Sequence, residues 1–313
     1  MMFAADTPPS ILDAHGSEAH HLANVWWIML GIAAFVYLVV GGFIVLSSVR
    51  GRRREPVEGP SRHDQYFIWI GGVIVPTVIL MFVAFLTVHT GAALRAPSKD
   101  PLRLHVIGNQ WWWAVEYPGT PVVTANEIHV PVGQPLEIQI DANDVAHSFW
   151  VPQLAGKQDA IPGQHNVLRF TVRQAGVYRG ECAEFCGLQH AHMSFRVIAE
   201  SPGDFTKWLL HEQQITPIPS SELAARGQVA FNSSACAGCH TVRGTDAHGN
   251  LGPDLTDVGS RARIGAETVD NTPQNLRRWI ADPSQFKPGV RMPPAVNSPD
   301  DLDAIVAYLE GLR

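Results

Sequence analysis

The sequence has few charged residues and few cysteines. Only 17% of its 313 residues are charged, the net charge is −6, and basic residues cluster in one short loop alone. This composition argues against nucleic-acid binding, because no basic face could follow a phosphate backbone. The four cysteines form two tight pairs, Cys182 with Cys186 and Cys236 with Cys239, and none is left over for a structural disulfide. A chain of this length has room for two ordinary domains plus membrane segments.

The N-terminal part lacks charge over two long stretches. Residues 1–24 contain no lysine or arginine and are predicted to form a polar tail. Without a basic region before the first apolar run they are not typical of a secretory signal, and an earlier, removed signal stays open. Residues 25–49 and 66–88 carry no charge, and each run can cross a hydrocarbon core of about 30 Å. They predict a transmembrane helical hairpin over residues 25–90, with Pro76 expected to kink the second helix.

The loop between these two runs is the basic cluster. Its arginines are Arg50, Arg52, Arg53, Arg54 and Arg62. Since short basic loops stay in the cytoplasm, both termini are predicted to lie on the outer face, which in a bacterium is the periplasm. The chain is therefore expected to be a two-helix protein of the bacterial inner membrane with periplasmic domains.

After the hairpin the pattern changes to short runs of alternating apolar residues. Leu136, Ile138 and Ile140 are one example, and turns rich in proline and glycine separate the runs between residues 102 and 198. This periodicity predicts an antiparallel β-sandwich. The domain boundaries follow as a β domain over 91–200, a linker over 201–221 and a C-terminal domain over 222–313.

One loop of the β domain holds a dense set of soft metal ligands. Cys182, Cys186, His190 and Met193 lie within twelve residues, and thiolate, imidazole and thioether ligands select copper over magnesium or calcium. His147, thirty-five residues before Cys182, can supply a second imidazole. Two bridging thiolates would then hold two coppers, each with one histidine.

Each copper would need one further, weak axial ligand. Met193 and the backbone carbonyl of Glu184 suit the two axial positions. A disulfide or a copper-delivery site would also use two cysteines at this spacing, but neither accounts for the histidine and methionine that follow Cys186. His192, two residues after His190, is the alternative imidazole.

Four runs in this region closely resemble a known family. QWWWAVEY, DVAHSFWVPQL, KQDAIPG and GECAEFCGLQHAHM are similar to subunit II of the haem-copper cytochrome c oxidases, over about residues 20 to 200. The resemblance implies a cupredoxin-like fold for the β domain and a dinuclear CuA centre. The ligands it implies are His147, Cys182, the Glu184 carbonyl, Cys186, His190 and Met193.

The resemblance also assigns roles to two further groups. Trp111 is expected to face the electron donor as part of an exposed aromatic patch, whereas Trp112 is expected to pack in the core or at an edge. The Glu184 side chain is expected to reach a Mg²⁺ or Mn²⁺ ion shared with oxidase subunit I. One departure concerns residues 65–69 at the start of the second helix, where many relatives have a glutamate for proton uptake. Here Asp64 is the nearest acid.

The second cysteine pair belongs to a C-x-x-C-H motif. Cys236 and Cys239 are typical of covalent haem c attachment, and His240 of the proximal iron ligand. Met292 is the one methionine after Met193 and is therefore predicted as the sixth ligand. A zinc site that also used His248 is the alternative.

This C-terminal part resembles an all-α, class I cytochrome c domain over residues 222–313. The resemblance implies that the Pro253 carbonyl accepts a hydrogen bond from the His240 ring.

Together these features predict a multidomain membrane protein that relays electrons. The resemblance implies a caa3-type oxidase, in which haem c accepts electrons from a cytochrome c donor and CuA passes them to subunit I for reduction of dioxygen. Subunits I and III are the implied partners, and the catalytic oxygen site lies in subunit I because two helices cannot build it. A CuA-type nitric oxide reductase and an electron-transfer protein outside an oxidase are the alternatives. A quinol oxidase is disfavoured because the copper ligands are present.

Overall fold

The computed structural model describes residues 9–51, 62–214, 219, 221–294 and 298–313. It divides into two units, residues 20–97 and residues 1–19 with 98–313. Several predicted features lie outside the described residues: most of the arginine loop, with Arg52, Arg53 and Arg54, and the centre of the linker at residues 216–218.

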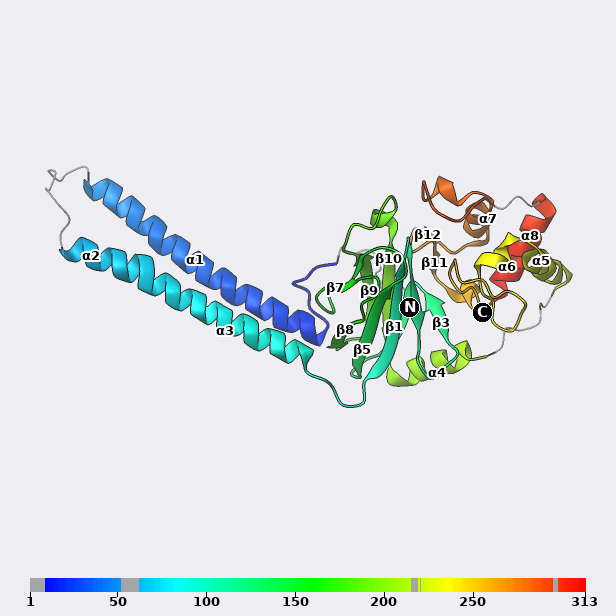
Figure 1. The fold of residues 1–313 in the computed structure, drawn as a ribbon, viewed down its shortest axis with the longest axis horizontal. Coiled ribbons are helices and arrows are strands. Elements are labelled where there is room, and N and C mark those ends of the chain that lie inside the picture. The colour runs from blue at the N-terminus through cyan, green and yellow to red at the C-terminus, as the bar shows by residue number, and fades with distance from the viewer. Residues whose placement is uncertain (1–8, 52–61, 215–218, 220, 295–297) are drawn as a thin grey trace. The chain divides into compact units, whose positions relative to one another are not determined.

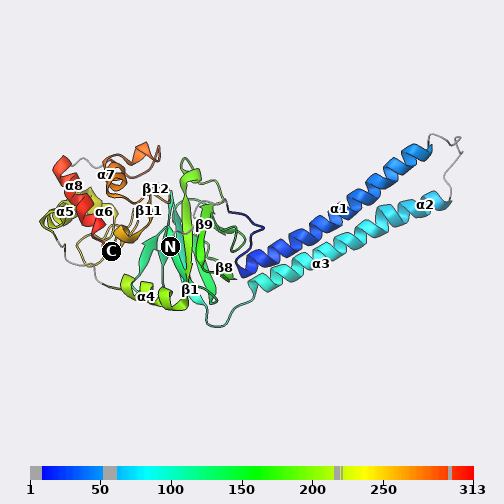
Figure 2. The same cartoon turned by 180° about the vertical axis from the view of Figure 1, so that it is seen from behind.

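The first unit is a pair of long apolar helical segments that run side by side (Figures 1 and 2). Both are long and apolar enough to cross a membrane. The rings of Phe43 and Phe67, one from each segment, lie 5.6 Å apart. The elements are α1 (Ser17–Gly51), α2 (Arg62–Trp69), the π-helix η1 (Ile70–Ile74) and α3 (Val75–Arg95).

These helices are longer than the uncharged runs that predict them. The first begins at Ser17 rather than residue 25, so part of the predicted polar tail is helical, and the second continues to Arg95 rather than residue 88. Glu18 in the first turn of α1 and Arg95 in the last turn of α3 suit the helix dipole at those ends. The predicted distortion at Pro76 lies one turn earlier, as the π-helical turn η1, in which the Val75 N–H donates to the Ile70 carbonyl.

The β domain consists of two five-stranded sheets. The first has the order β3-β2-β1-β5-β8 and the second the order β4-β10-β9-β6-β7. The strands of the first sheet are β1 (Leu102–Asn109), β2 (Trp112–Glu116), β3 (Val123–Ala125), β5 (Pro135–Ala142) and β8 (Asn166–Thr171). Those of the second are β4 (Glu127–Pro131), β6 (His147–Trp150), β7 (Gln158–Ala160), β9 (Gly176–Cys182) and β10 (Ser194–Glu200).

Both sheets are mixed, so the prediction of a purely antiparallel sandwich was wrong. β1 pairs with β5 in parallel, and β4 pairs with β10 in parallel. Alternation predicts which face of a strand is buried but not the direction of its neighbour, because the period of two is the same in both pairings. The buried faces do follow the alternation, as in β5, where Leu136, Ile138 and Ile140 are buried.

Trp113 fills the centre of the core between the sheets. Its side chain is fully buried, and its ring lies 5.6 Å from that of Phe149 and 5.8 Å from that of Phe195. Replacing such a residue with alanine costs about 3–5 kcal/mol. The same ring lies 5.7 Å from that of His147, so it packs against a predicted copper ligand.

The first half of the predicted linker is a helix of this domain. α4 (Pro202–Glu212) begins at Ser201, whose side chain accepts a hydrogen bond from the Asp204 N–H. Trp208 stacks on His129 of β4 with ring centroids 4.1 Å apart. The amphipathic stretch around Trp208 is thus packed against the sheet.

The C-terminal domain is helical apart from one short hairpin. Helices α5 and α8 of this domain pack closely against each other at Gly227. A Cβ added to Gly227 would lie 1.9 Å from the Ala304 carbonyl oxygen. Only glycine allows this approach. Its elements are α5 (Glu222–Ser233), α6 (Ala235–Cys239), η3 (Val258–Ser260), β11 (Arg263–Ile264), β12 (Val269–Asp270), α7 (Pro273–Ala281), η4 (Pro283–Gln285) and α8 (Pro299–Glu310).

Candidate metal centres

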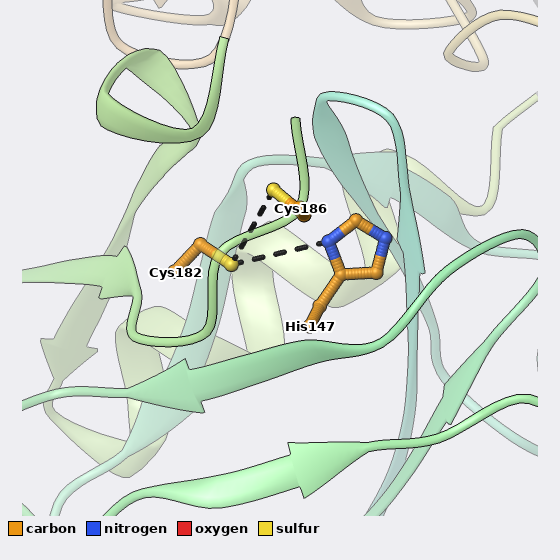
Figure 3. A group of neighbouring side chains, drawn as sticks. All are labelled: His147, Cys182 and Cys186. Atoms are coloured by element: carbon orange, nitrogen blue, oxygen red, sulfur yellow. Dashed lines mark hydrogen bonds between the residues drawn. The ribbon is translucent and has the colours of Figure 1, made fainter. Parts of the chain in front are cut away.

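The first centre begins with the pairing of two adjacent strands. In the antiparallel register of β6 and β9, Phe149 lies opposite Cys182, so His147 at the start of β6 is close to the end of β9. The His147 Nδ1 atom lies 3.9 Å from the Cys182 Sγ atom (Figure 3). Two residues far apart in the sequence therefore meet because the sheet aligns them.

The loop between β9 and β10 adds the other groups. The two sulfurs of Cys182 and Cys186 lie 3.8 Å apart (Figure 3). The Cys186 sulfur lies 3.6 Å from the His190 Nδ1 atom and 3.8 Å from the Met193 sulfur. The Glu184 carbonyl oxygen lies 3.2 Å from the Cys182 sulfur. All six predicted ligand groups are thus joined by contacts of less than 4 Å.

The surroundings suit soft metal ions. His147, Cys182, Cys186 and Met193 are buried, and the atoms of the first three that could bind a metal lie within 4.8 Å of one another. The hydrogen bond between the thiols lowers the pKa of Cys182 and raises that of Cys186, because the thiolate of one is stabilised by the proton of the other. Deprotonated sulfur is the form that binds copper.

Asp144 orients the His147 ring and was missed by the sequence analysis. Its Oδ1 atom lies 2.9 Å from His147 Nε2, which leaves Nδ1 facing the sulfurs. Burial raises the pKa of Asp144, but hydrogen bonds from His147, Val145 and the Gln110 N–H outweigh this and lower it overall. Its place three residues before the histidine was the available signal.

The structure separates the two candidate histidines. His192 is exposed, and its Nδ1 atom lies 2.7 Å from the Gln189 side-chain oxygen, whereas His190 faces Cys186. The Glu184 side chain is exposed while its carbonyl faces Cys182.

The second centre is a cavity of about 360 Å³ around the C-x-x-C-H motif. Cys236 and Cys239 are on α6, and His240 and Met292 line the same cavity. The His240 Nδ1 atom lies 2.8 Å from the Pro253 carbonyl, so the other ring nitrogen is free to bind iron. Burial lowers the pKa of His240, which favours the neutral ring that metals bind.

The cavity fits a large apolar group. Its walls are mostly aliphatic and aromatic. A Cβ on Gly252 would lie 2.5 Å from the His240 ring, so only glycine at this position leaves enough space for the imidazole. Apolar lining residues include Phe231, Leu251, Leu255, Leu276, Trp279, Ile280, Val290 and Leu309.

Trp111 lies between the two centres. Its indole Nε1–H donates to the Cys186 carbonyl at 3.1 Å, and the residue also lines the cavity that holds Cys236 and Cys239. Its side chain is buried, with 7% exposed, so the expectation of an exposed aromatic patch was wrong. The reason is that Lys287 and Arg291 of the C-terminal domain cover this position. Trp112, expected in the core or at an edge, is half-buried in strand β2.

Comparisons with known proteins agree with both centres. Residues 119–200 match the family model described as cytochrome C oxidase subunit II, periplasmic domain, and residues 224–313 match that of cytochrome c. A cytochrome c oxidase subunit 2 of Alkalihalophilus pseudofirmus is 32% identical, over 96% of this chain and 90% of that protein. The chain belongs to the cytochrome c oxidase subunit II family. It is therefore a subunit of an oxidoreductase complex and carries a fused cytochrome c domain, as predicted.

Other members of the subunit II family are similar over shorter parts. A cytochrome c oxidase subunit 2 of Bacillus sp. (strain PS3) is 32% identical over 83% of this chain and 76% of that protein. The crystal structure of the periplasmic domain of subunit II from Bradyrhizobium japonicum aligns with 37% of this chain and 95% of that chain, at 30% identity and a TM-score of 0.36.

Proposed function

We propose that this subunit II is the electron-accepting subunit of a caa3-type cytochrome c oxidase. It receives electrons from a cytochrome c donor at a covalent haem c and delivers them through a dinuclear CuA centre to subunit I, where dioxygen is reduced to water. The observation that carries the proposal is the continuous chain of contacts from His147 through both cysteines to His190 and Met193.

The same set would hold the copper. His147 and His190 would each supply an imidazole, Cys182 and Cys186 the thiolates, and Met193 and the Glu184 carbonyl the weaker ligands. A dinuclear copper centre bound there would supply reversible one-electron transfer. The protein contributes a buried cage in which Asp144 holds the His147 ring and Trp113 supports it.

The haem ligands follow from the second cavity. Cys236 and Cys239 would form the covalent attachments of a haem c, and His240 and Met292 would be the ligands to its iron. A histidine and methionine pair raises the reduction potential, as an electron donor to copper requires. The bond from the His240 ring to the Pro253 carbonyl fixes the orientation of the imidazole.

Two residues extend the route to the partners. Trp111, in contact with the Cys186 carbonyl, is the position through which electrons reach the copper centre. The Glu184 carboxylate would be a ligand for a Mg²⁺ or Mn²⁺ ion shared with subunit I, since the residue is exposed while its carbonyl contacts the Cys182 sulfur.

The membrane arrangement is part of the proposal. The two apolar helical segments anchor the chain in the bacterial inner membrane beside subunits I and III, with both metal domains in the periplasm. Either proton entry at the start of α2 differs from that of relatives with a glutamate there, or subunit I supplies it; Asp64 in the first turn is the nearest acid.

Purification of the tagged chain from its native membrane in mild detergent tests the proposal. Haem a signals, a CuA absorption band and dioxygen uptake from reduced cytochrome c are the expected results. Nitric oxide consumption with only b- and c-type haems would assign the chain to a reductase instead. Recovery of the chain without any partner subunit would favour an electron-transfer protein outside an oxidase.

A further inference from the structure

Lys287 is buried to an extent that is rare for lysine. Only 2% of it is exposed, and it lies in the turn after η4, five residues before Met292. Its Nζ atom donates to three backbone carbonyls, those of His192 at 2.8 Å, Trp111 at 3.2 Å and Gly265 at 3.2 Å. An ammonium group has three N–H donors, so this set uses all of them.

The three acceptors come from separate segments. Trp111 precedes β2, and Gly265 lies in the hairpin of the cytochrome c domain. His192 lies immediately before Met193 in the loop between β9 and β10, residues 183–193, which we call the copper loop. A buried lysine is costly unless its donors are satisfied, and burial here lowers its pKa to about 7. Exposed ion pairs would be enough to hold the β domain and the cytochrome c domain together, so simple attachment of the domains does not require a buried lysine.

Neighbouring contacts hold the same segment at both ends. The Gln189 amide donates to the Pro288 carbonyl at 2.5 Å. The Arg291 guanidinium donates to the Gln110 side chain and lies 3.5 Å from the Asp144 carboxylate. The segment from Lys287 to Arg291, which leads directly to Met292, therefore contacts the copper loop and the residues around Trp111.

We propose that Lys287 is a positioning residue for electron transfer between the two centres. It ties the segment that carries Met292 to the backbone of Trp111 and of the copper loop, and so fixes the distance between the haem cavity and the copper ligands. This rests on the proposed function. Electron transfer depends on the distance between the two centres, so a loose segment would slow transfer without altering either centre.

Lys287→Met in the intact, fully loaded oxidase is the test. Methionine is unbranched and apolar, one atom shorter than lysine, and removes the three donors. Haem c is reduced by a light pulse, and the reduction of copper is followed by its near-infrared absorption. We expect a lower rate, because the segment that carries Met292 is no longer held to the carbonyls of Trp111 and His192. The haem and copper spectra should stay as in wild type, and both midpoint potentials are measured with the rate, because Lys287 interacts with the charge of Cys186 and its loss alters the driving force.

Lys207→Met is the matched control. Lys207 lies on α4 with 81% of its side chain exposed, and its Nζ atom lies 3.0 Å from the Asp204 carboxylate. Its replacement should leave the rate unchanged. A wild-type rate in Lys287→Met, with or without a lower melting temperature, would show a purely structural lysine and overturn the proposal.

A measurement without cofactors gives a second readout. Amide hydrogen exchange of the full chain should be faster in Lys287→Met at residues 286–292 and 189–193 together, and unchanged exchange there contradicts the proposal. If Lys287→Met does not load both centres, the rate of electron transfer is measured in Lys287→Gln, which keeps two donors. A rate below that of wild type supports the proposal, and a wild-type rate overturns it. Absence of the copper or haem signal from the wild-type chain is a different result, because it refutes the proposed function on which this role of Lys287 rests.

Discussion

The indole N–H of Trp111 donates to the carbonyl of Cys186 at 3.1 Å. The Gln110 amide donates to the same carbonyl at 2.6 Å, so the backbone of this predicted copper ligand is held by two neighbouring side chains. Gln110 and Trp111 both also line the cavity around the C-x-x-C-H motif. Two residues of the β domain thus contact both candidate centres.

Trp111→Phe should slow electron transfer to copper and leave the copper spectrum nearly unchanged. The ring stays apolar and buried, but the hydrogen bond to Cys186 is lost, which also lowers the free energy of unfolding by about 0.5–1.5 kcal/mol. Flash reduction and thermal unfolding measure the two effects. Trp112→Phe is the control, because Trp112 is half-buried and lines the same cavity, but among the described residues the Cys186 carbonyl accepts from Gln110 and Trp111 instead. Equal rates in both variants would exclude a special role for Trp111.

His190→Asn should abolish the near-infrared absorption of the copper centre while leaving the haem spectrum intact. His190 faces the Cys186 sulfur at 3.6 Å, whereas His192 is exposed and bonds to Gln189. His192→Asn is therefore the control and should keep the absorption. The ligand assignment fails if the absorption survives in His190→Asn or disappears in His192→Asn.

Asp144→Asn should lower copper affinity by about 10- to 100-fold, the usual cost of losing a partner that orients a ligand histidine. Competition with a copper chelator of known affinity measures it. Arg291→Gln separates the two roles of this carboxylate, because Arg291 also contacts Asp144 but not His147. We expect nearly wild-type affinity in Arg291→Gln. Equal losses in both variants would attribute the effect to the ion pair.

Met292→Leu should lower the haem reduction potential and slow the reduction of copper, because a thioether ligand raises the potential of the iron. Leucine conserves the volume of the side chain, so the cavity should persist. A spectroelectrochemical titration gives the potential. An unchanged potential would mean that another residue is the sixth ligand.

Five of the six predicted copper ligands could be proposed from the sequence because they share one short loop, where spacing alone brings them together. His147 was proposed from the sequence as a further imidazole, but its place beside the loop depends on the pairing of β6 with β9, which no local pattern encodes. The burial of Trp111 by Lys287 and Arg291 could not be predicted from the sequence. Lys287 contacts its carbonyl across 176 residues of sequence, and a single lysine in a loop carries no signal of burial. The parallel strand pairs escaped for the same reason, since direction is set by connections distant in sequence.

Glu212 gives a prediction for the pH dependence of stability. It is buried at the end of α4, and burial together with the neighbouring Asp257 raises its pKa from 4.5 to about 9, although Arg261 and Arg243 oppose this. Between these values the folded chain keeps a proton that the unfolded chain releases. The stabilisation is therefore complete below pH 4.5 and is lost as the pH rises to about 9.

Glu212→Gln should remove that dependence, because the amide is neutral at every pH and similar in shape. Wild-type stability should fall more steeply with rising pH, by up to about 1.4 kcal/mol per pH unit for one proton. Thermal unfolding of the full chain in detergent from pH 5 to pH 9 measures both slopes. Glu222→Gln, at an exposed position in α5, should keep the wild-type slope. Parallel slopes for wild type and Glu212→Gln would show that the buried carboxyl group does not retain its proton.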